Sequence, residues 1–312
     1  EEEEEGGEKY ESNDTSLTVK NSYNAHESNK TVQNKTNITY RFFEDFNLIR
    51  TLGSGSYGCV FEAEKILENM VYAVKRVQLQ KSPDAEPAEH EKKLTKAWME
   101  VTTMAKLNHR GIVRYYNAWI EEPTPCDVFV YIQMQLCTST LKEWLKANQK
   151  PRDMGRMKAW MKQLLEAVAY IHEKNFIHRD LKPSNILFDG EDELKICDLG
   201  IAAAFEIRDD GKEATNTRTM GKGTSLYMSP EQSFWLYKSA VDVFTLGLIF
   251  AEISVPMKGA GRKQIFANYR TGMPNYILMD AATKELIEWM TTVDSDDRPS
   301  SRQVLHSRFF SD

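Results

Sequence analysis

Eight consecutive residues of this chain combine the side chains that phosphoryl transfer needs. His178–Asn185 reads HRDLKPSN, and an Asp-x-Gly triplet begins at Asp198, thirteen positions after Asn185. Asp180 would accept the proton of an attacking hydroxyl, Lys182 would face a phosphate, and Asn185 with Asp198 would hold magnesium beside nucleotide phosphates. A lone His-Arg-Asp triplet is more often a surface turn, but the complete string at this spacing predicts a catalytic loop.

A glycine-rich segment lies upstream of this loop. Gly53–Val60 reads GSGSYGCV, and the strand-like run Tyr72–Val77 (YAVKRV) follows it. The G-x-G-x-x-G pattern alone is weak, because turns collect glycine and dinucleotide-binding folds use the same pattern. That fold requires a helix directly after the glycines. The second strand therefore favours a loop that covers phosphates, with Lys75 holding the alpha and beta phosphates.

Lys75 needs a carboxylate from a helix to hold its ammonium group in place. We predict Glu100 for this role, because apolar residues repeat at helical spacing through residues 94–107 and give that helix a buried side. Glu89 and Glu91 are competing candidates, and a solvated helix face is the ordinary alternative for Glu100.

Composition limits the classes of protein to which the chain can belong. Its 312 residues, 41% of them hydrophobic, are enough for two lobes around a sizeable core. A net charge of −6 and a pI of about 5.7 argue against nucleic acid as the main partner. The four cysteines lack paired metal spacing and indicate reduced thiols. The longest apolar run, Val241–Ile253, is interrupted by Asp242 and Glu252, so it predicts a buried helix rather than a membrane span.

The chain divides into a tail and a folded domain. Residues 1–40 are acidic and polar with few large apolar groups, so we expect disorder there. Residues 41–311 predict an α+β fold of two lobes, a small β-rich N-lobe (about 41–137) with one main helix and a larger, mainly helical C-lobe (about 138–311). The expected elements are strands from Phe42 to about Arg76, a charged loop at 81–93, strands at 112–121 and 128–134 joined by a turn at 123–127, and an amphipathic helix at 157–171.

These motifs resemble the protein kinases, and this resemblance implies ATP and Mg²⁺ as cofactors. The string DLKPSN is the serine/threonine form of the catalytic loop, and Gly223-Thr224 ahead of Ser229-Pro230-Glu231 is similar to the matching substrate loop. Tyrosine is an unfavoured acceptor. Leu199 stands where the family usually has Phe beneath the magnesium-binding aspartate. Because leucine also packs an apolar side chain beneath that aspartate, we expect the kinase to remain active.

Three strings resemble a particular branch of the kinases. They are Gly111–Trp119 (GIVRYYNAW), Tyr131–Cys137 (YIQMQLC) and Leu226–Gln232 (LYMSPEQ). They are similar to kinases that phosphorylate the alpha subunit of translation initiation factor 2, most of all the PKR-like endoplasmic reticulum kinase, with the heme-regulated kinase next. That member usually has a long insert where this chain has only residues 123–127. The resemblance implies a stress-response kinase that attenuates translation, either cytoplasmic or on the cytosolic face of the endoplasmic reticulum if a membrane-spanning region lies upstream.

The resemblance also assigns residues to the nucleotide pocket. Met134 would be the gatekeeper, Gln135 and Cys137 would offer backbone groups to the base, and Val60 and Ala73 would cover its ring. The full set of ATP-binding residues implied is Leu52, Gly53, Gly55, Gly58, Val60, Ala73, Lys75, Met134, Gln135 and Cys137. Separately, Arg298 would pair with Glu231 to anchor the substrate loop, although a solvated turn charge is the ordinary alternative.

Regulatory residues follow from the same resemblance. Arg41 and Asp45 would pair across a homodimer of back-to-back N-lobes, with Tyr115 at the interface. An ordinary exposed ion pair is the alternative.

The activating phosphosite of the family corresponds to Thr219, with Thr224 as a second candidate. A phosphate adds about −1.5 to −2 charge. Arg179 and Lys96 are its predicted partners, and this contact would link the loop to the Lys75–Glu100 pair.

Substrate docking is expected on the helix after the buried helix of the C-lobe, within residues 261–272. Lys263, Phe266 and Asn268 are its candidate docking residues. The alternative is that the apolar residues there pack inward. We expect this segment neither to bind nucleic acid nor to span a membrane.

Two other functions remain open. A pseudokinase scaffold would lack magnesium-dependent ATP turnover, but every phosphoryl-transfer residue named above is present. A serine/threonine kinase with another substrate can be distinguished only by a substrate assay.

Overall fold

The structure, a computed structural model, describes residues 40–55, 58–80, 87–124, 127–150, 152–190, 193–199, 203–204, 216–217, 226–234, 236–274 and 279–311. Almost all of the predicted tail therefore lies outside the described residues. So do Thr219 and Thr224, and so does the side chain of Lys96 on its helix.

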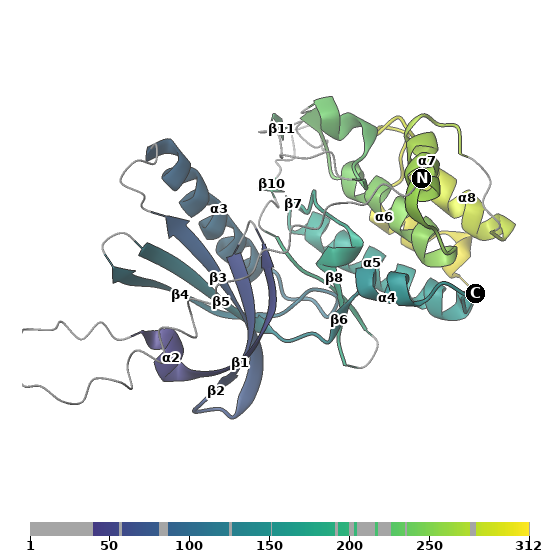
Figure 1. The fold of residues 1–312 in the computed structure, drawn as a ribbon. Helices are drawn as coiled ribbons and strands as arrows, with labels where there is room; N and C mark the ends of the chain where they lie inside the picture. Colours follow the sequence, from purple (N-terminus) through teal and green to yellow (C-terminus); the bar gives the residue numbers. More distant parts are fainter. Residues whose placement is uncertain are drawn as a thin grey trace, which may run out of the picture. The chain divides into compact units, whose positions relative to one another are not determined.

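The N-lobe is built on a five-stranded antiparallel sheet with the order β1-β2-β3-β5-β4 (Figure 1). Its strands are β1 (Phe46–Gly55), β2 (Gly58–Lys65), β3 (Met70–Gln80), β4 (Tyr115–Thr124) and β5 (Asp127–Gln135). Helix α3 (Pro87–Lys106) contacts β3 and β4. This arrangement confirms the predicted β-rich lobe with one main helix.

Three local predictions for this lobe were wrong. Residues Arg41–Asp45 form a short helix, α2, instead of the start of a strand, and this places Phe42 in a stack with Phe46 and Tyr131 at ring distances of 5.6 and 5.2 Å. Helix α3 begins at Pro87, inside the expected charged loop, since proline is tolerated in the first helical turn. Strand β4 ends at Thr124 and β5 begins at Asp127, so the strands take up part of the expected turn at 123–127, and residues 125–126 lie outside the described residues.

The C-lobe is mainly helical. Its helices are α4 (Leu141–Ala147), α5 (Met154–Glu173), α6 (Ala240–Ser254), α7 (Gly259–Arg270), α8 (Ala281–Met290) and α9 (Ser301–Leu305). Helix α6 is buried from Val241 to Ser254, and α5 buries the apolar residues that repeat along it from Met157 to Ile171. Both helices were predicted from these patterns. Together with the N-lobe sheet, they confirm the expected α+β fold.

Short strands and 3-10 turns complete the C-lobe, and some of them flank the loops of the site. They are β6 (Ser139–Thr140), β7 (Phe176–Ile177), β8 (Ile186–Phe188), β9 (Leu194–Ile196), β10 (Ala203–Ala204), β11 (Asn216–Thr217) and β12 (Leu236–Tyr237), with 3-10 turns η1 (Pro183–Asn185), η2 (Pro230–Phe234) and η3 (Arg308–Phe310). Strands β6, β8 and β9 form one small sheet. The predicted catalytic loop lies between β7 and β8, and Asp198 follows β9 by two residues.

One buried cluster joins the lobes beneath the site. It runs from Ala73 and Met134 of the sheet to Leu164 on α5 and Phe244 on α6, and it includes Leu199. Because protein cores are packed as densely as organic crystals, this cluster is a rigid base for the loops above it. Among the described helices, none combines the length and the apolar composition that crossing a bilayer requires.

Candidate active site

An ion pair joins the sheet of the N-lobe to its helix. Lys75 on β3 places Nζ 2.6 Å from Glu100 Oε1 on α3 and 3.4 Å from Asp198 Oδ1. Both Lys75 and Glu100 are buried. Burial works to lower the pKa of Lys75, but the charges of Glu100 and Asp198 outweigh it and raise that pKa to about 12. Lys75 is therefore a fixed cation at neutral pH, held between the two carboxylates.

The predicted catalytic loop gathers its polar side chains around Asp180. Lys182 Nζ donates to Asp180 Oδ2 at 2.7 Å. Asn185 Nδ2 donates to the backbone oxygen of Asp180 at 2.9 Å and to its Oδ2 at 3.2 Å. The Asp180 carboxylate is thereby oriented by a cation and an amide, as an acceptor for a substrate hydroxyl proton would need to be.

Asp242 holds the backbone of the catalytic loop through hydrogen bonds, a role that the sequence did not reveal. Its carboxylate is buried at the start of α6 and accepts hydrogen bonds from the backbone N–H groups of His178 and Arg179, both at 2.8 Å. The ring Nε2 of His172 lies 2.9 Å from the same carboxylate. Arg179 has a left-handed backbone with φ of 68°. An aspartate that interrupts a buried helix was the available signal, since a buried charge must have partners.

Asp198 and Asn185 fit a magnesium site. Asn185 directs its amide nitrogen at Asp180, which leaves Oδ1 as the ligand atom. Burial works to raise the pKa of Asp198, but the nearby charges, Lys75 first, hold it below its usual value, so the side chain is an anion. Within the described residues, no group of three or more His, Cys, Asp or Glu side chains could hold a metal. Two protein ligands suffice for Mg²⁺, which keeps waters and substrate phosphates as its other ligands.

One face of the N-lobe sheet carries Lys75 and the residues predicted to cover the nucleotide base. Val60 on β2 pairs with Lys75, and Ala73 on β3 pairs with the buried Met134 on β5, so these residues share a face. Gly58 has φ of 115°, and a Cβ there would lie 2.0 Å from Arg76 O. Only glycine fits at that position, so the turn can lie close against β3.

The family comparison decides what this arrangement belongs to. Residues 46–310 match the model of the protein kinase domain. The chain belongs to the protein kinase family.

Three relatives illustrate the range of similar kinases. The chain is 36% identical over 288 residues to the interferon-induced, double-stranded RNA-activated protein kinase of Mus musculus, covering 88% of this chain and 52% of that protein. It is 33% identical over 198 residues to the eukaryotic translation initiation factor 2-alpha kinase of Caenorhabditis elegans, covering 58% and 18%. It is 32% identical over 212 residues to the cell division control protein 2 homolog 1 of Trypanosoma brucei brucei, covering 67% and 64%.

These identities make the chain a serine/threonine protein kinase domain with translation-factor kinases among its relatives. The chain spans about half the length of the mouse protein and of its rat counterpart, 52% and 54%. The expected likeness to the endoplasmic reticulum member in particular stays a prediction, because the RNA-activated kinases are as similar. ATP and Mg²⁺ are the general requirements of a protein kinase domain.

The structure narrows which backbone groups of the predicted hinge could contact a base. The backbone N–H of Gln135 donates to Arg114 O at 2.8 Å, so it is not free to bind a base. The Gln135 side chain instead donates to Asp189 Oδ2 at 2.8 Å. Cys137 lies two residues beyond β5, and burial raises the pKa of its thiol to about 11, so the thiol is protonated at neutral pH. Gln135 could therefore offer only its backbone carbonyl to the base, and both Gln135 and Cys137 stay predicted hinge residues.

The anchor of the substrate loop is present as predicted. Arg298 Nη1 and Nη2 lie 2.5 and 3.2 Å from the two carboxylate oxygens of Glu231, and Arg298 also donates to three backbone carbonyls. A bidentate, buried arginine is a structural anchor, not a solvated turn charge. Leu199 is 1% exposed in the main core, which agrees with its expected role as apolar fill.

The predicted dimer pair lies on α2 and the predicted docking residues lie on α7. Arg41 Nε pairs with Asp45 Oδ2 of its own helix at 3.1 Å, and both side chains are partly exposed. On α7, Lys263 is exposed and Asn268 is half-buried. Phe266 was wrongly predicted to dock substrate, because it is completely buried and packs on Tyr227 at a ring distance of 5.3 Å. The apolar residues of α7 thus face the core.

Proposed function

We propose that this kinase transfers the γ-phosphoryl group of ATP to a serine of the alpha subunit of translation initiation factor 2, and so attenuates translation under stress. The observation that carries the proposal is the similarity to a nematode protein that is itself named as a kinase of this factor. The three sequence strings at 111–119, 131–137 and 226–232 point to the same branch of the family.

The site geometry supports catalysis rather than a scaffold role. Lys75 is held at 2.6 Å by Glu100, and Asp180 is oriented by Lys182 and Asn185. We assign Lys75 to the alpha and beta phosphates, Asp180 to the proton of the attacking serine hydroxyl, and Lys182 to the transferred phosphoryl group. The serine oxygen bonds to the γ-phosphorus as the bond to the bridging oxygen of ADP breaks, and the hydroxyl proton passes to Asp180.

Magnesium bound by Asn185 and Asp198 would neutralise charge on the nucleotide phosphates. The remaining work of the chain is positioning. The backbone of His178 and Arg179 is held by Asp242, and the Lys75 cation is kept charged by its carboxylate neighbours. The catalytic loop and Lys75 are therefore in place before substrate arrives.

The test is phosphorylation of the purified factor by the purified chain with Mg²⁺ and ATP, with the acceptor serine mapped by mass spectrometry. The expected result is one modified serine, with transfer reduced about a hundredfold or more in the Asp180→Asn variant. Transfer to a general substrate such as myelin basic protein but not to the factor would assign the kinase to another substrate. Failure to turn over ATP with any substrate would favour the pseudokinase scaffold.

A further inference from the structure

A polar chain of side chains lies behind the segment that joins the two lobes. Gln135, the last residue of β5, donates from Nε2 to Asp189 Oδ2 at 2.8 Å. Lys195 on β9 places Nζ 3.3 Å from the same carboxylate oxygen and donates to the backbone oxygen of Arg110 at 2.7 Å. We call Gln135, Asp189 and Lys195 the hinge clamp.

The clamp ties three separate parts of the fold together. Gln135 precedes residues 136–138, by which the chain passes from the sheet of the N-lobe to β6. Asp189 is in the turn between β8 and β9, where its Oδ1 accepts from Gly190 N–H at 2.8 Å. The Arg110 carbonyl belongs to the connection from α3 to β4. Each end of the clamp therefore contacts the N-lobe, and its centre lies in the C-lobe hairpin.

Backbone hydrogen bonds run beside the clamp at both of its ends. Thr138 donates from N and from Oγ1 to Phe188 O, at 2.9 and 3.1 Å. On the other side, Ile196 N–H donates to Gly111 O at 2.8 Å, and Val113 N–H donates to Ile196 O at 2.9 Å. These bonds place the hinge and the α3–β4 connection on one hairpin, and Asp198 follows that hairpin directly.

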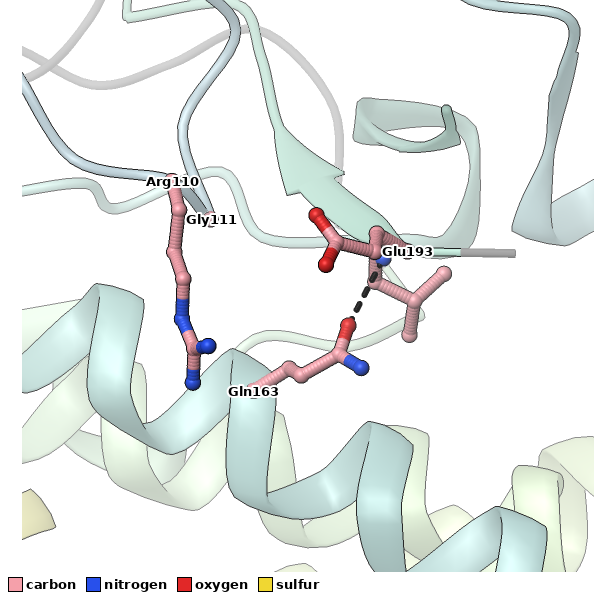
Figure 2. Close-up of a pocket in the computed structure, with 5 residues that line it drawn as sticks. Arg110, Gly111, Gln163 and Glu193 are labelled. Carbon is pink, nitrogen blue, oxygen red and sulfur yellow. Dashed lines mark hydrogen bonds between the residues drawn. The ribbon is translucent and has the colours of Figure 1, made fainter. Parts of the chain in front are cut away.

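The hairpin is in turn held on the C-lobe. Figure 2 shows Gln163 reaching from helix α5 toward the strand next to Glu193, where Leu194 N–H donates to Gln163 Oε1 at 2.8 Å. The Arg110 side chain extends toward the same helix and pairs with Glu166 at 2.6 Å. The cavity between them holds about 10 Å³, which is room for roughly one water molecule. It is too small to be a ligand site, so the region is a packed joint.

Burial makes Lys195 dependent on these partners. Its side chain is only 8% exposed, and a buried ammonium group is costly unless acceptors surround it. Asp189 supplies the neutralising charge, and the Arg110 carbonyl supplies a second acceptor. Moving the hinge away from the hairpin would separate Gln135 from Asp189, and moving the α3–β4 connection would leave the Lys195 ammonium short of an acceptor.

We propose that the hinge clamp is a positioning network that holds the interlobe segment and the α3–β4 connection on the β8–β9 hairpin, and thereby sets the affinity of the kinase for nucleotide. The clamp touches none of the phosphoryl-transfer groups. It acts through the spacing between the N-lobe sheet and the β8–β9 hairpin, between which the nucleotide would bind. It does not depend on which protein is the substrate.

The test measures binding of MgADP by calorimetry to the Gln135→Met, Lys195→Met and double variants. Methionine keeps the length and the apolar stem of each side chain while removing its donors. Each single variant should bind about five- to tenfold more weakly, as expected when a charge-assisted hydrogen bond is lost and its effect is partly transmitted to the ligand. Because the clamp works as one unit, the double variant should bind about as weakly as either single variant.

Two further measurements separate positioning from general destabilisation. In Lys195→Met the value of kcat at saturating ATP should change by less than about twofold. In both single variants hydrogen exchange at the Thr138 amide should become faster. Arg110→Ala is the matched control, since it removes a surface ion pair but keeps the carbonyl that Lys195 uses, so MgADP affinity should not change.

The proposal is overturned if Gln135→Met binds MgADP as tightly as the wild type, if the two single effects add in the double variant, or if Arg110→Ala weakens binding equally. Gln135 is half-buried rather than buried, so Gln135→Met still tests the proposal if Lys195→Met does not fold. MgADP binding needs no protein substrate, so a failure here is distinct from a failure to phosphorylate the initiation factor.

Discussion

Arg179 and Asp242 are joined by a hydrogen bond that links the catalytic loop to the buried helix α6. The Arg179 N–H donates to Asp242 Oδ1 at 2.8 Å while Arg179 keeps a left-handed backbone, φ 68°. Left-handed backbone is unfavourable for a residue other than glycine and persists only where surrounding contacts impose it. The Asp242 carboxylate is such a contact, because it also accepts from His178 N–H at 2.8 Å.

Asp242→Asn should therefore weaken both stability and catalysis. The amide can accept only one of the two backbone bonds well, so the free energy of unfolding at neutral pH should fall by about 1–3 kcal/mol. Chemical denaturation would measure this, and kcat should fall while the KM for ATP changes little. A variant with normal stability and normal kcat would show that the loop keeps its conformation without the Asp242 charge.

The pH dependence of stability offers a second measurement on the same residue. Burial works to raise the pKa of Asp242, but the hydrogen bond and charge of His172 and the other donors hold it below its usual 3.8. A lowered pKa contributes stability that is complete above the unfolded value and is lost as pH falls through the folded one. The difference in unfolding free energy between the wild type and Asp242→Asn should therefore shrink below about pH 4. If the difference in unfolding free energy between the two proteins stays constant down to acid pH, this assignment is contradicted.

Asp180→Asn tests the catalytic base. The substitution keeps the size of the side chain and its contacts with Lys182 and Asn185, so folding and MgADP affinity should remain close to wild type. Turnover should fall about a hundredfold or more, the size of general-base assistance. Rapid-quench measurement of one turnover isolates the chemical step. Retained turnover would place the base on another residue.

Arg41 and Asp45 test the proposed dimer of N-lobes. Within one chain they already form an exposed pair at 3.1 Å, which is worth only about 0.3–0.5 kcal/mol. Arg41→Asp and Asp45→Arg should each weaken self-association by placing like charges together, and the double swap should restore it. Analytical ultracentrifugation gives the association constant for each variant. If none of the three variants changes it, the pair is only the intrahelical one, and Tyr115 loses its proposed interfacial role.

Thr219 tests activation by phosphorylation. A phosphothreonine there would add charge for Arg179 and Lys96 to engage, and α3 would connect this contact to Glu100. Thr219→Ala should lower activity, whereas Thr224→Ala should act through the shape of the substrate loop. Intact-mass and peptide spectra of the active enzyme identify the modified residue, and Asp180→Asn should lack it if the kinase modifies itself. Fully active enzyme without phosphate at Thr219 would exclude this activation step.

Lys263 tests docking of a folded substrate on the outer side of α7. Lys263→Ala should raise the KM for the intact initiation factor about two- to fivefold, the size of one exposed charge contact, and leave autophosphorylation unchanged. Lys142→Ala, at another exposed lysine on α4, is the control. Equal efficiency on a short peptide that carries the acceptor serine would contradict docking at α7.

Some parts of this kinase could be predicted from the sequence because they depend on local patterns. The buried helix α6 and the amphipathic helix α5 follow from hydrophobic spacing, and the catalytic loop follows from a string whose residue types are tied to one reaction. The Lys75–Glu100 pair was predicted correctly for a similar reason, since the apolar spacing around Glu100 identified which side of its helix is buried.

Other parts depend on contacts between residues far apart in the chain. Hydrophobic spacing places Phe266 on the apolar face of a helix, but it does not show whether that face packs on the core or meets a partner. Its packing on Tyr227 shows that the face is turned to the core. Asp242 is 63 residues from Arg179, and Gln135 is 54 residues from Asp189. Bonds over such separations are set when the lobes fold around one core. The sequence by itself was enough to indicate the family and the candidate catalytic groups, because both reside in short strings. Only the tertiary structure decided how the loop and the hinge are held, because a buried polar group is satisfied by whichever partner the fold brings to it.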